Sequence, residues 1–267
     1  MLGAIVGDIA GSTREWNNIK SKNFEFLPKR SFFTDDSVMT LAVAQWLVED
    51  SAHETNTLVF SMQDLGRRYP HAGYGNRFRQ WLHKDNPEPY NSWGNGSGMR
   101  VSPVALYATS LKECLDLAKR SAEITHNHPE GIKGAQAIAA ATFMAGHGID
   151  KSEIKEYISK TFGYDLNRSI EQIRPTYEFT ESCQGSVPEA IIAYLESKDF
   201  KDAIRNAISI GGDSDTIAAM TGAIAAAEYG IPQDIAKFCM GKLTPELQEI
   251  LVKFEETIKY MKTEIYR

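Results

Sequence analysis

Apolar residues recur at three- and four-residue spacing along nearly the whole chain, which is the pattern of helices with one buried face. The first run covers residues 2–10 and ends at the Gly11-Ser12 pair. Further helices are predicted directly after the Thr-Asp-Asp-Ser sequence at 34–37 and over residues 103–120, 131–147, 152–161, 187–196, 199–209, 215–229, 233–241 and 245–262. Persuasive strand-like alternation is absent from the sequence. The pattern therefore predicts an all-α fold, a helical bundle.

Residues 66–102 interrupt this pattern with many glycines and aromatic side chains. A loop of this length inside a compact domain is often functional. We therefore interpret the segment as a long functional loop.

Two short acidic motifs indicate the chemistry most strongly: Thr-Asp-Asp-Ser at 34–37 and Gly-Gly-Asp-Ser-Asp-Thr at 211–216. One aspartate or threonine before a helix is explained by capping, because its oxygen accepts a hydrogen bond from a free backbone N–H. A second carboxylate is not needed for capping, and both motifs contain one. We infer that two helix starts meet to hold hard cations such as Mg²⁺, which prefer carboxylate and hydroxyl oxygens. Because the motifs lie near opposite ends of the sequence, a shared site would tie residues 1–267 into a single domain.

Composition limits the possible partners and compartment. The chain has 29 basic and 35 acidic residues, a net charge of −6, which argues against generic binding to nucleic acid or to anionic membranes. Three scattered cysteines without Cys-x-x-Cys pairing favour a reducing setting. The sequence shows neither a secretion signal nor an apolar run of membrane length. We therefore expect a cytoplasmic protein that does not enter a membrane, and the sequence leaves its oligomeric state open.

Three further segments contain candidate polar chemistry. Glu15 follows the Gly7-Asp8 pair: either Asp8 caps a turn and Glu15 lies in water, or Glu15 is an acid/base carboxylate beside the metals. The glycine-rich run 93–100 offers backbone N–H groups that can cradle a diphosphate, with Arg100 adding positive charge, although such loops are common. The run 125–130 contains two histidines without the spacing of a zinc site.

Together these segments resemble the ADP-ribosylglycohydrolase family, which includes the dinitrogenase reductase-activating glycohydrolases and the ADP-ribosyl-arginine and ADP-ribosyl-serine hydrolases. The matching motifs are, in chain order, Gly7-Asp8, Gly11-Ser12, Glu15, Thr34-Asp35-Asp36, Gly94-Asn95-Gly96-Ser97, Thr125-His126 and Gly212-Asp213-Ser214-Asp215-Thr216. Ser37 stands where many relatives carry a second threonine, which preserves a hydroxyl. Residues 66–93 match no specificity pattern, so the leaving group stays open.

The resemblance implies a compact all-α fold with a cleft that holds two Mg²⁺ ions, sometimes Mn²⁺. The metal ligands that it implies are Thr34, Asp35 and Asp36 on one side and Asp213, Asp215 and Thr216 on the other. Glu15 would contact a metal or its water. The residues that would contact the diphosphate or the adjoining ribose are Gly96, Ser97 and Gly98, and His126 would line the ADP-ribose site.

We predict from this a Mg²⁺-dependent hydrolase that releases ADP-ribose from a protein side chain, a nucleic acid or a small molecule. The metals would orient the ribose and activate a water, while Glu15 or a metal-bound carboxylate, Asp36 or Asp213, would transfer protons. Two other functions fit the same residues. One is a non-catalytic ADP-ribose binder or crystallin-like structural relative, and the other is a metal phosphohydrolase that releases phosphate.

Overall fold

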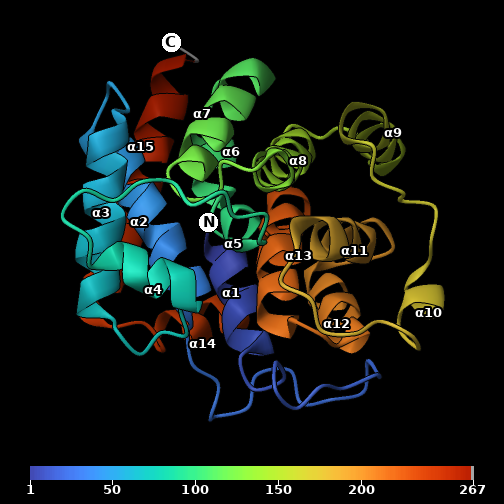
Figure 1. Cartoon of the computed structure of the whole chain (residues 1–267). Coiled ribbons are helices and arrows are strands. Elements are labelled where there is room, and N and C mark those ends of the chain that lie inside the picture. The colour runs from blue at the N-terminus through green and yellow to red at the C-terminus, as the bar shows by residue number, and fades with distance from the viewer. Residues whose placement is uncertain (266–267) are drawn as a thin grey trace.

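The computed structural model describes residues 1–265, which fold into a bundle of helices (Figure 1). The helices are α1 Leu2–Gly11, α2 Asp35–Glu49, α3 Thr55–Arg68, α4 Asn76–Leu82, α5 Gly96–Met99, α6 Ser102–Tyr107, α7 Leu111–Glu123, α8 Pro129–Gly146, α9 Lys151–Phe162, α10 Ile170–Ile173, α11 Cys183–Leu195, α12 Phe200–Ile210, α13 Ser214–Tyr229, α14 Gln233–Met240 and α15 Pro245–Ile265. Over these residues there is no strand, and an isolated β-bridge joins Gly94 to Ser182. The predicted all-α fold is therefore confirmed. The predicted single domain also included residues 266 and 267, which lie outside the described part.

Helices α1 and α13 lie side by side at the centre of the bundle (Figure 1). A Cβ atom added to Gly3 would stand 2.2 Å from the Gly222 carbonyl oxygen, and one added to Gly11 would stand 2.4 Å from Asp215 Cα. Such distances leave no room for a side chain, so only glycine allows this approach. Because the contacts run in opposite directions along the two helices, the end of α1 meets the start of α13.

The remaining helices enclose this pair from two sides. Helix α2 packs against α3, α6 and α15, whereas α13 packs against α8, α11 and α12 (Figure 1). Most of the buried apolar side chains, from Met1 to Phe254, belong to one hydrophobic cluster. The bundle thus places the starts of α2 and α13 near the end of α1.

Several predicted helix limits were wrong. The predicted helix 103–120 is two helices, α6 and α7, because the hydroxyl of Ser110 accepts a hydrogen bond from the Glu113 N–H at 3.2 Å and begins a new helix. The supposed loop 66–102 contains α4 and α5, and α3 and α10 were not predicted. Helix α11 begins at Cys183 rather than at residue 187, since Ser182 caps it.

None of the helices over residues 1–265 combines the length and the apolar character that a bilayer span requires. The three cysteines, Cys114, Cys183 and Cys239, are buried and free.

Candidate metal centre and active site

Asp8 of α1 organises the start of α2. Its Oδ2 accepts hydrogen bonds from the backbone N–H groups of Thr34 at 2.9 Å and Ser37 at 3.1 Å, and the Ser37 hydroxyl donates to the same oxygen. Its Oδ1 accepts from the Thr34 hydroxyl at 2.8 Å. The fully buried Asp8 therefore caps a helix distant in sequence. Its role is to orient the segment that contains Asp35 and Asp36.

Two glycines shape the start of α13. Gly211 and Gly212 have φ angles of +78° and +70°, which residues with a Cβ rarely adopt, and they turn the chain from α12 into α13. Asp213 then occupies the N-cap and Asp215 the first turn, where the helix dipole favours carboxylates. The side chain of Asn95 donates to Asp213 Oδ2 at 2.6 Å and fixes that carboxylate.

The two acidic motifs meet directly. The Thr216 hydroxyl of α13 donates a hydrogen bond to Asp36 Oδ2 of α2 at 3.2 Å, although the two residues are 180 positions apart. The same carboxylate oxygen lies 3.4 Å from the Thr34 hydroxyl. Asp36 therefore bridges threonine hydroxyls from both motifs, and the structure brings together the two helix starts singled out in the sequence.

Glu15 reaches this cluster from the loop after α1. One oxygen each from Glu15, Asp213 and Asp215 lie within 4.8 Å of one another. The loop is held in place by Asn18, whose amide donates to the Glu15 carbonyl at 2.7 Å and to the Gly212 carbonyl at 2.9 Å. Asn18 Oδ1 in turn accepts from the Gly212 N–H at 2.6 Å. The half-buried Glu15 therefore faces the cluster rather than bulk water.

The gathered carboxylates repel one another in a buried place. Burial raises the pKa of Asp8 to about 6, and burial with repulsion from Asp215 raises the pKa of Glu15 to about 7. Burial raises the pKa of Asp213 to about 7 as well. The pKa values of three more are raised well above their ordinary range, first by burial and then by neighbouring carboxylates: Asp35, Asp36 and Asp215. In the described part of the chain none of the six forms an ion pair with a basic residue.

These residues fit a hard divalent cation. Asp36 Oδ1 and the Tyr74 hydroxyl are buried, and neither has a hydrogen-bond partner among the described residues. Unpaired carboxylates with threonine hydroxyls form the donor set that Mg²⁺ and Mn²⁺ prefer. Buried charges of one sign also require a compensating charge or protons. The acidic cluster can therefore hold metal.

His126 lies on the opposite wall beside the glycine-rich loop. Its Nδ1 lies 2.7 Å from the Thr125 hydroxyl, which itself accepts a hydrogen bond from Arg100 at 2.9 Å. The Thr125 hydroxyl and Nδ1 thus share a hydrogen bond, which leaves Nε2 of His126 for another partner. Burial and the charge of Arg100 hold the pKa of His126 well below its ordinary value. A Cβ added to Gly96 would lie 3.1 Å from Nε2, so this nitrogen borders the loop.

The other predicted ligand-binding residues of this loop lie deeper. Ser97 is fully buried, and its hydroxyl donates to the Gly131 carbonyl at 2.7 Å. Gly98 is also buried, beside Met220. Arg100, which was expected to add charge for a diphosphate, lines the cleft; it is 1% exposed and its guanidinium donates to three oxygens of the protein. The positive charge of Arg100 thus fixes the loop from within.

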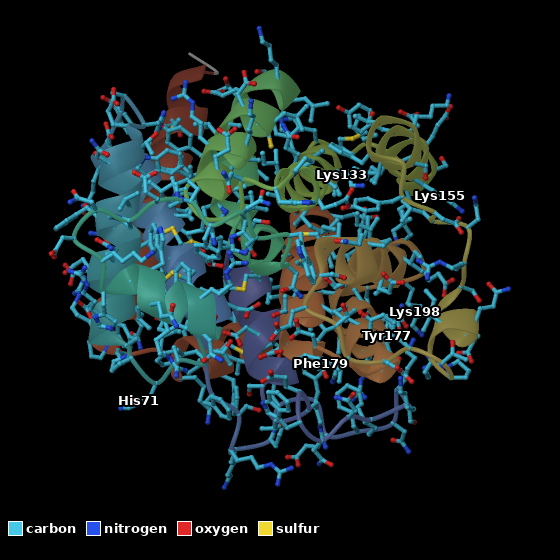
Figure 2. All side chains as sticks on the ribbon, viewed as in Figure 1. His71, Lys133, Lys155, Tyr177, Phe179 and Lys198 are labelled. Atoms are coloured by element: carbon cyan, nitrogen blue, oxygen red, sulfur yellow. The ribbon has the colours of Figure 1, made fainter. Side chains whose placement is uncertain are left out.

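A cleft of about 640 Å³ joins these two walls. Its lining includes the acidic cluster and its threonines, Glu15, Thr34, Asp35, Asp36, Asp213, Asp215 and Thr216, together with Tyr90, Asn95, Gly96, Arg100 and His126. The exposed Arg77, which stacks over the ring of Tyr90, adds a cation to the second wall. Figure 2 shows His71, another lining residue, and Phe179 on either side of the lower end of α1. The cleft lining therefore combines a cluster of carboxylates with two arginines, Arg77 and Arg100.

The sequence model of the ADP-ribosylglycohydrolase family matches residues 1–259. The chain belongs to the ADP-ribosylglycohydrolase family. It is 28% identical to ADP-ribosylhydrolase ARH3 of Homo sapiens over 79% of this chain and 75% of that protein. It is also 28% identical to ADP-ribosylarginine hydrolase Tri1 of Pseudomonas putida, over 86% of this chain and 70% of that protein. A solved structure described as an ADP-ribosylglycohydrolase-related protein complex shares the fold, with a TM-score of 0.69 and 24% identity over 95% of both chains.

Some site residues of this ADP-ribosylglycohydrolase family member were not found from the sequence. Asn95 was quoted within the motif Gly94-Asn95-Gly96-Ser97, but its role in fixing Asp213 was not predicted. Its polar side chain between two glycines was the signal that could have indicated such a role. Asn18 and Tyr74 offered no comparable signal, because their contacts depend on tertiary packing.

Proposed function

We propose that the protein is a Mg²⁺-dependent hydrolase that cleaves the glycosidic bond between ADP-ribose and an acceptor, with Mn²⁺ able to replace Mg²⁺. The observation that supports this most is the hydrogen bond between Thr216 and Asp36, since it unites two acidic helix starts into one unpaired cluster. The family membership and the names of the relatives fit the same reaction. The partner is thus an ADP-ribosylated substrate.

Six residues would hold two metal ions: Thr34, Asp35 and Asp36 from the start of α2, and Asp213, Asp215 and Thr216 from the start of α13. Bound metal supplies Lewis-acid charge that orients hydroxyl groups and lowers the pKa of water. Asp8 supports one half of this set by hydrogen bonding to Thr34, and Asn95 supports the other through Asp213.

Glu15 is our candidate for proton transfer. Its carboxylate lies beside Asp213 and Asp215 and lines the cleft, where a general acid or base is needed. The carboxylates of Asp36 and Asp213 are further candidates for the same work, because they border the space between the motifs. Neutral His126 would donate its Nε2–H to an oxygen of the ADP-ribose.

The segment Gly96 to Gly98 would approach the diphosphate or the adjoining ribose through its backbone, because the Ser97 hydroxyl is already bonded to Gly131. We place the protein in the cytoplasm, away from membranes and without generic affinity for nucleic acid, on the grounds of its charge of −6 and its free cysteines.

Replacement of Asp213 or Asp215 by alanine tests the proposal. Metal binding by calorimetry should weaken and release of ADP-ribose should cease, while circular dichroism stays helical. Asp116→Ala, which changes an exposed aspartate of α7, is the matched control. Full activity of both cleft variants would contradict the assignment. Binding of ADP-ribose without release would favour a non-catalytic binder, and release of phosphate would favour a phosphohydrolase.

A further inference from the structure

The segment before α11 brings Glu181 to the cleft and Phe179 against Trp16, which also lines the cleft. It is pinned beside the glycine-rich loop, since the Asn95 N–H donates to the Glu181 carbonyl at 2.7 Å. The hydroxyls of Thr180 and Ser182 lie 2.9 Å apart, and Ser182 caps α11. Glu181, between these two residues, lines the cleft, and Phe179 directly precedes Thr180.

Trp16 forms one surface with Phe179 and Glu181. It follows Glu15 in the chain and lines the cleft, and its ring stacks on Phe179 with centroids 5.5 Å apart and an angle of 22° between the planes. Trp16 is 82% exposed and Phe179 is 41% exposed. Figure 2 shows Phe179 at the lower end of α1, where the loop that contains Trp16 begins. Two stacked, exposed rings beside buried carboxylates indicate a surface for a ligand rather than for the core.

The charge of this surface is negative. Glu181 is exposed and lines the same cleft as Glu15 and Asp213, whose pKa values its charge helps to raise. Among the side chains that the structure describes, it has no ion pair with a basic residue. Lys20, on the same loop as Trp16, is engaged with the carbonyl oxygens of residues 177 and 210, both at 2.6 Å. Aromatic faces beside a free carboxylate complement a planar cation.

We propose that Trp16, Phe179 and Glu181 form the leaving-group subsite and that it takes the guanidinium of an ADP-ribosylated arginine. The inference rests on the proposed function, because a leaving group exists only where the bond is cleaved. Water would add its hydroxyl to the anomeric carbon, the bond from that carbon to the guanidinium nitrogen would break, and the nitrogen would take the proton. The rings stack on the guanidinium plane and Glu181 pairs with its charge. The neutral hydroxyl of serine uses neither contact, and a neutral nucleobase uses the rings alone.

Steady-state kinetics on the Mg²⁺-loaded protein separates these leaving groups. The substrates are an ADP-ribosyl-arginine peptide, an ADP-ribosyl-serine peptide and an ADP-ribosylated oligonucleotide. Trp16→Ala and Glu181→Gln should each lower kcat/KM for the arginine substrate by about fivefold or more, the range expected for loss of one desolvated cation contact. Inhibition by free ADP-ribose should stay unchanged. Glu178→Gln is the matched control, because it removes the same charge three residues earlier, at a position outside the cleft lining.

Wild-type preference for the serine substrate, or an equal loss on all three substrates, would overturn the subsite. Loss on the oligonucleotide in Trp16→Ala but not in Glu181→Gln, with no loss on arginine, would show a nucleobase subsite instead. If no substrate is cleaved, the proposed hydrolase fails, and equilibrium binding then tests the subsite. The ADP-ribosyl-arginine peptide should bind more tightly than ADP-ribose in a manner that needs Trp16, and equal affinities would overturn the inference.

Discussion

Replacement of Asp213 by asparagine is expected to stabilise the metal-free protein increasingly as the pH rises. Burial raises the pKa of Asp213 from 3.8 to about 7 in the folded protein. A group of this kind contributes its full stability below the unfolded-state pKa and loses it as the pH rises through the folded-state pKa. The wild-type protein is therefore destabilised between about pH 4 and pH 7 by a charge that asparagine does not acquire. Asparagine can still accept the hydrogen bond from Asn95.

The size of the effect follows from the two pKa values. Between about pH 5 and about pH 8 they correspond to roughly 2.7 kcal/mol of free energy of unfolding. Part of this destabilisation is recovered when the neighbouring Asp215 shares the proton. We therefore expect the variant to gain about 1 to 3 kcal/mol of free energy of unfolding over the wild type. With Mg²⁺ present, the wild type should become more stable than the Asp213→Asn variant, because the ion stabilises the protein that binds it more tightly.

Urea denaturation in a chelating buffer, followed by far-ultraviolet circular dichroism at both pH values, measures this difference. Asp116→Asn, an exposed change on α7, is the control and should show no pH-dependent gain. A variant that is less stable than the wild type at about pH 8 without metal would refute the reasoning. A stability difference that does not vary with pH would refute it as well.

Two further substitutions test the packing around the site. Gly7→Ala would place a Cβ 2.0 Å from the Ala218 carbonyl oxygen, so the free energy of unfolding should fall by about 2 kcal/mol or more in thermal denaturation. Gly146→Ala, whose Cβ meets nothing closer than 3.6 Å, should be neutral, and equal melting of the two variants would contradict the close α1–α13 contact. Asn18→Ala frees the loop that holds Glu15, so kcat should fall about tenfold in steady-state assays while ADP-ribose affinity by calorimetry is unchanged. An unchanged kcat would remove Asn18 from the positioning of Glu15.

Local patterns in the sequence were enough to predict the all-α fold and to single out the two acidic motifs that meet in the structure. Helical spacing of apolar residues reports a buried face directly, and a carboxylate surplus before a helix is visible without tertiary structure. The Thr216 to Asp36 hydrogen bond shows that the two helix starts meet. Metal ligation by these residues stays a prediction.

Tertiary contacts explain what the sequence could not show. Asp8 was an ambiguous residue, since its partners Thr34 and Ser37 lie on another helix. Arg100 lines the cleft but is 1% exposed, and its hydrogen bonds to the protein could not be foreseen from a charge next to glycines. The stacking of Trp16 on Phe179 depends on how two loops pack and leaves no local pattern.

The central claim is tested most directly by incubating the purified protein with ADP-ribosylated arginine, serine and nucleic-acid substrates, with Mg²⁺ and then with EDTA. Chromatography follows free ADP-ribose. We predict release that requires the metal, from the arginine substrate above all, and its recovery when Mg²⁺ or Mn²⁺ replaces the chelator. Release that continues unchanged in EDTA, or its absence from every substrate, would contradict a metal-dependent ADP-ribosyl hydrolase.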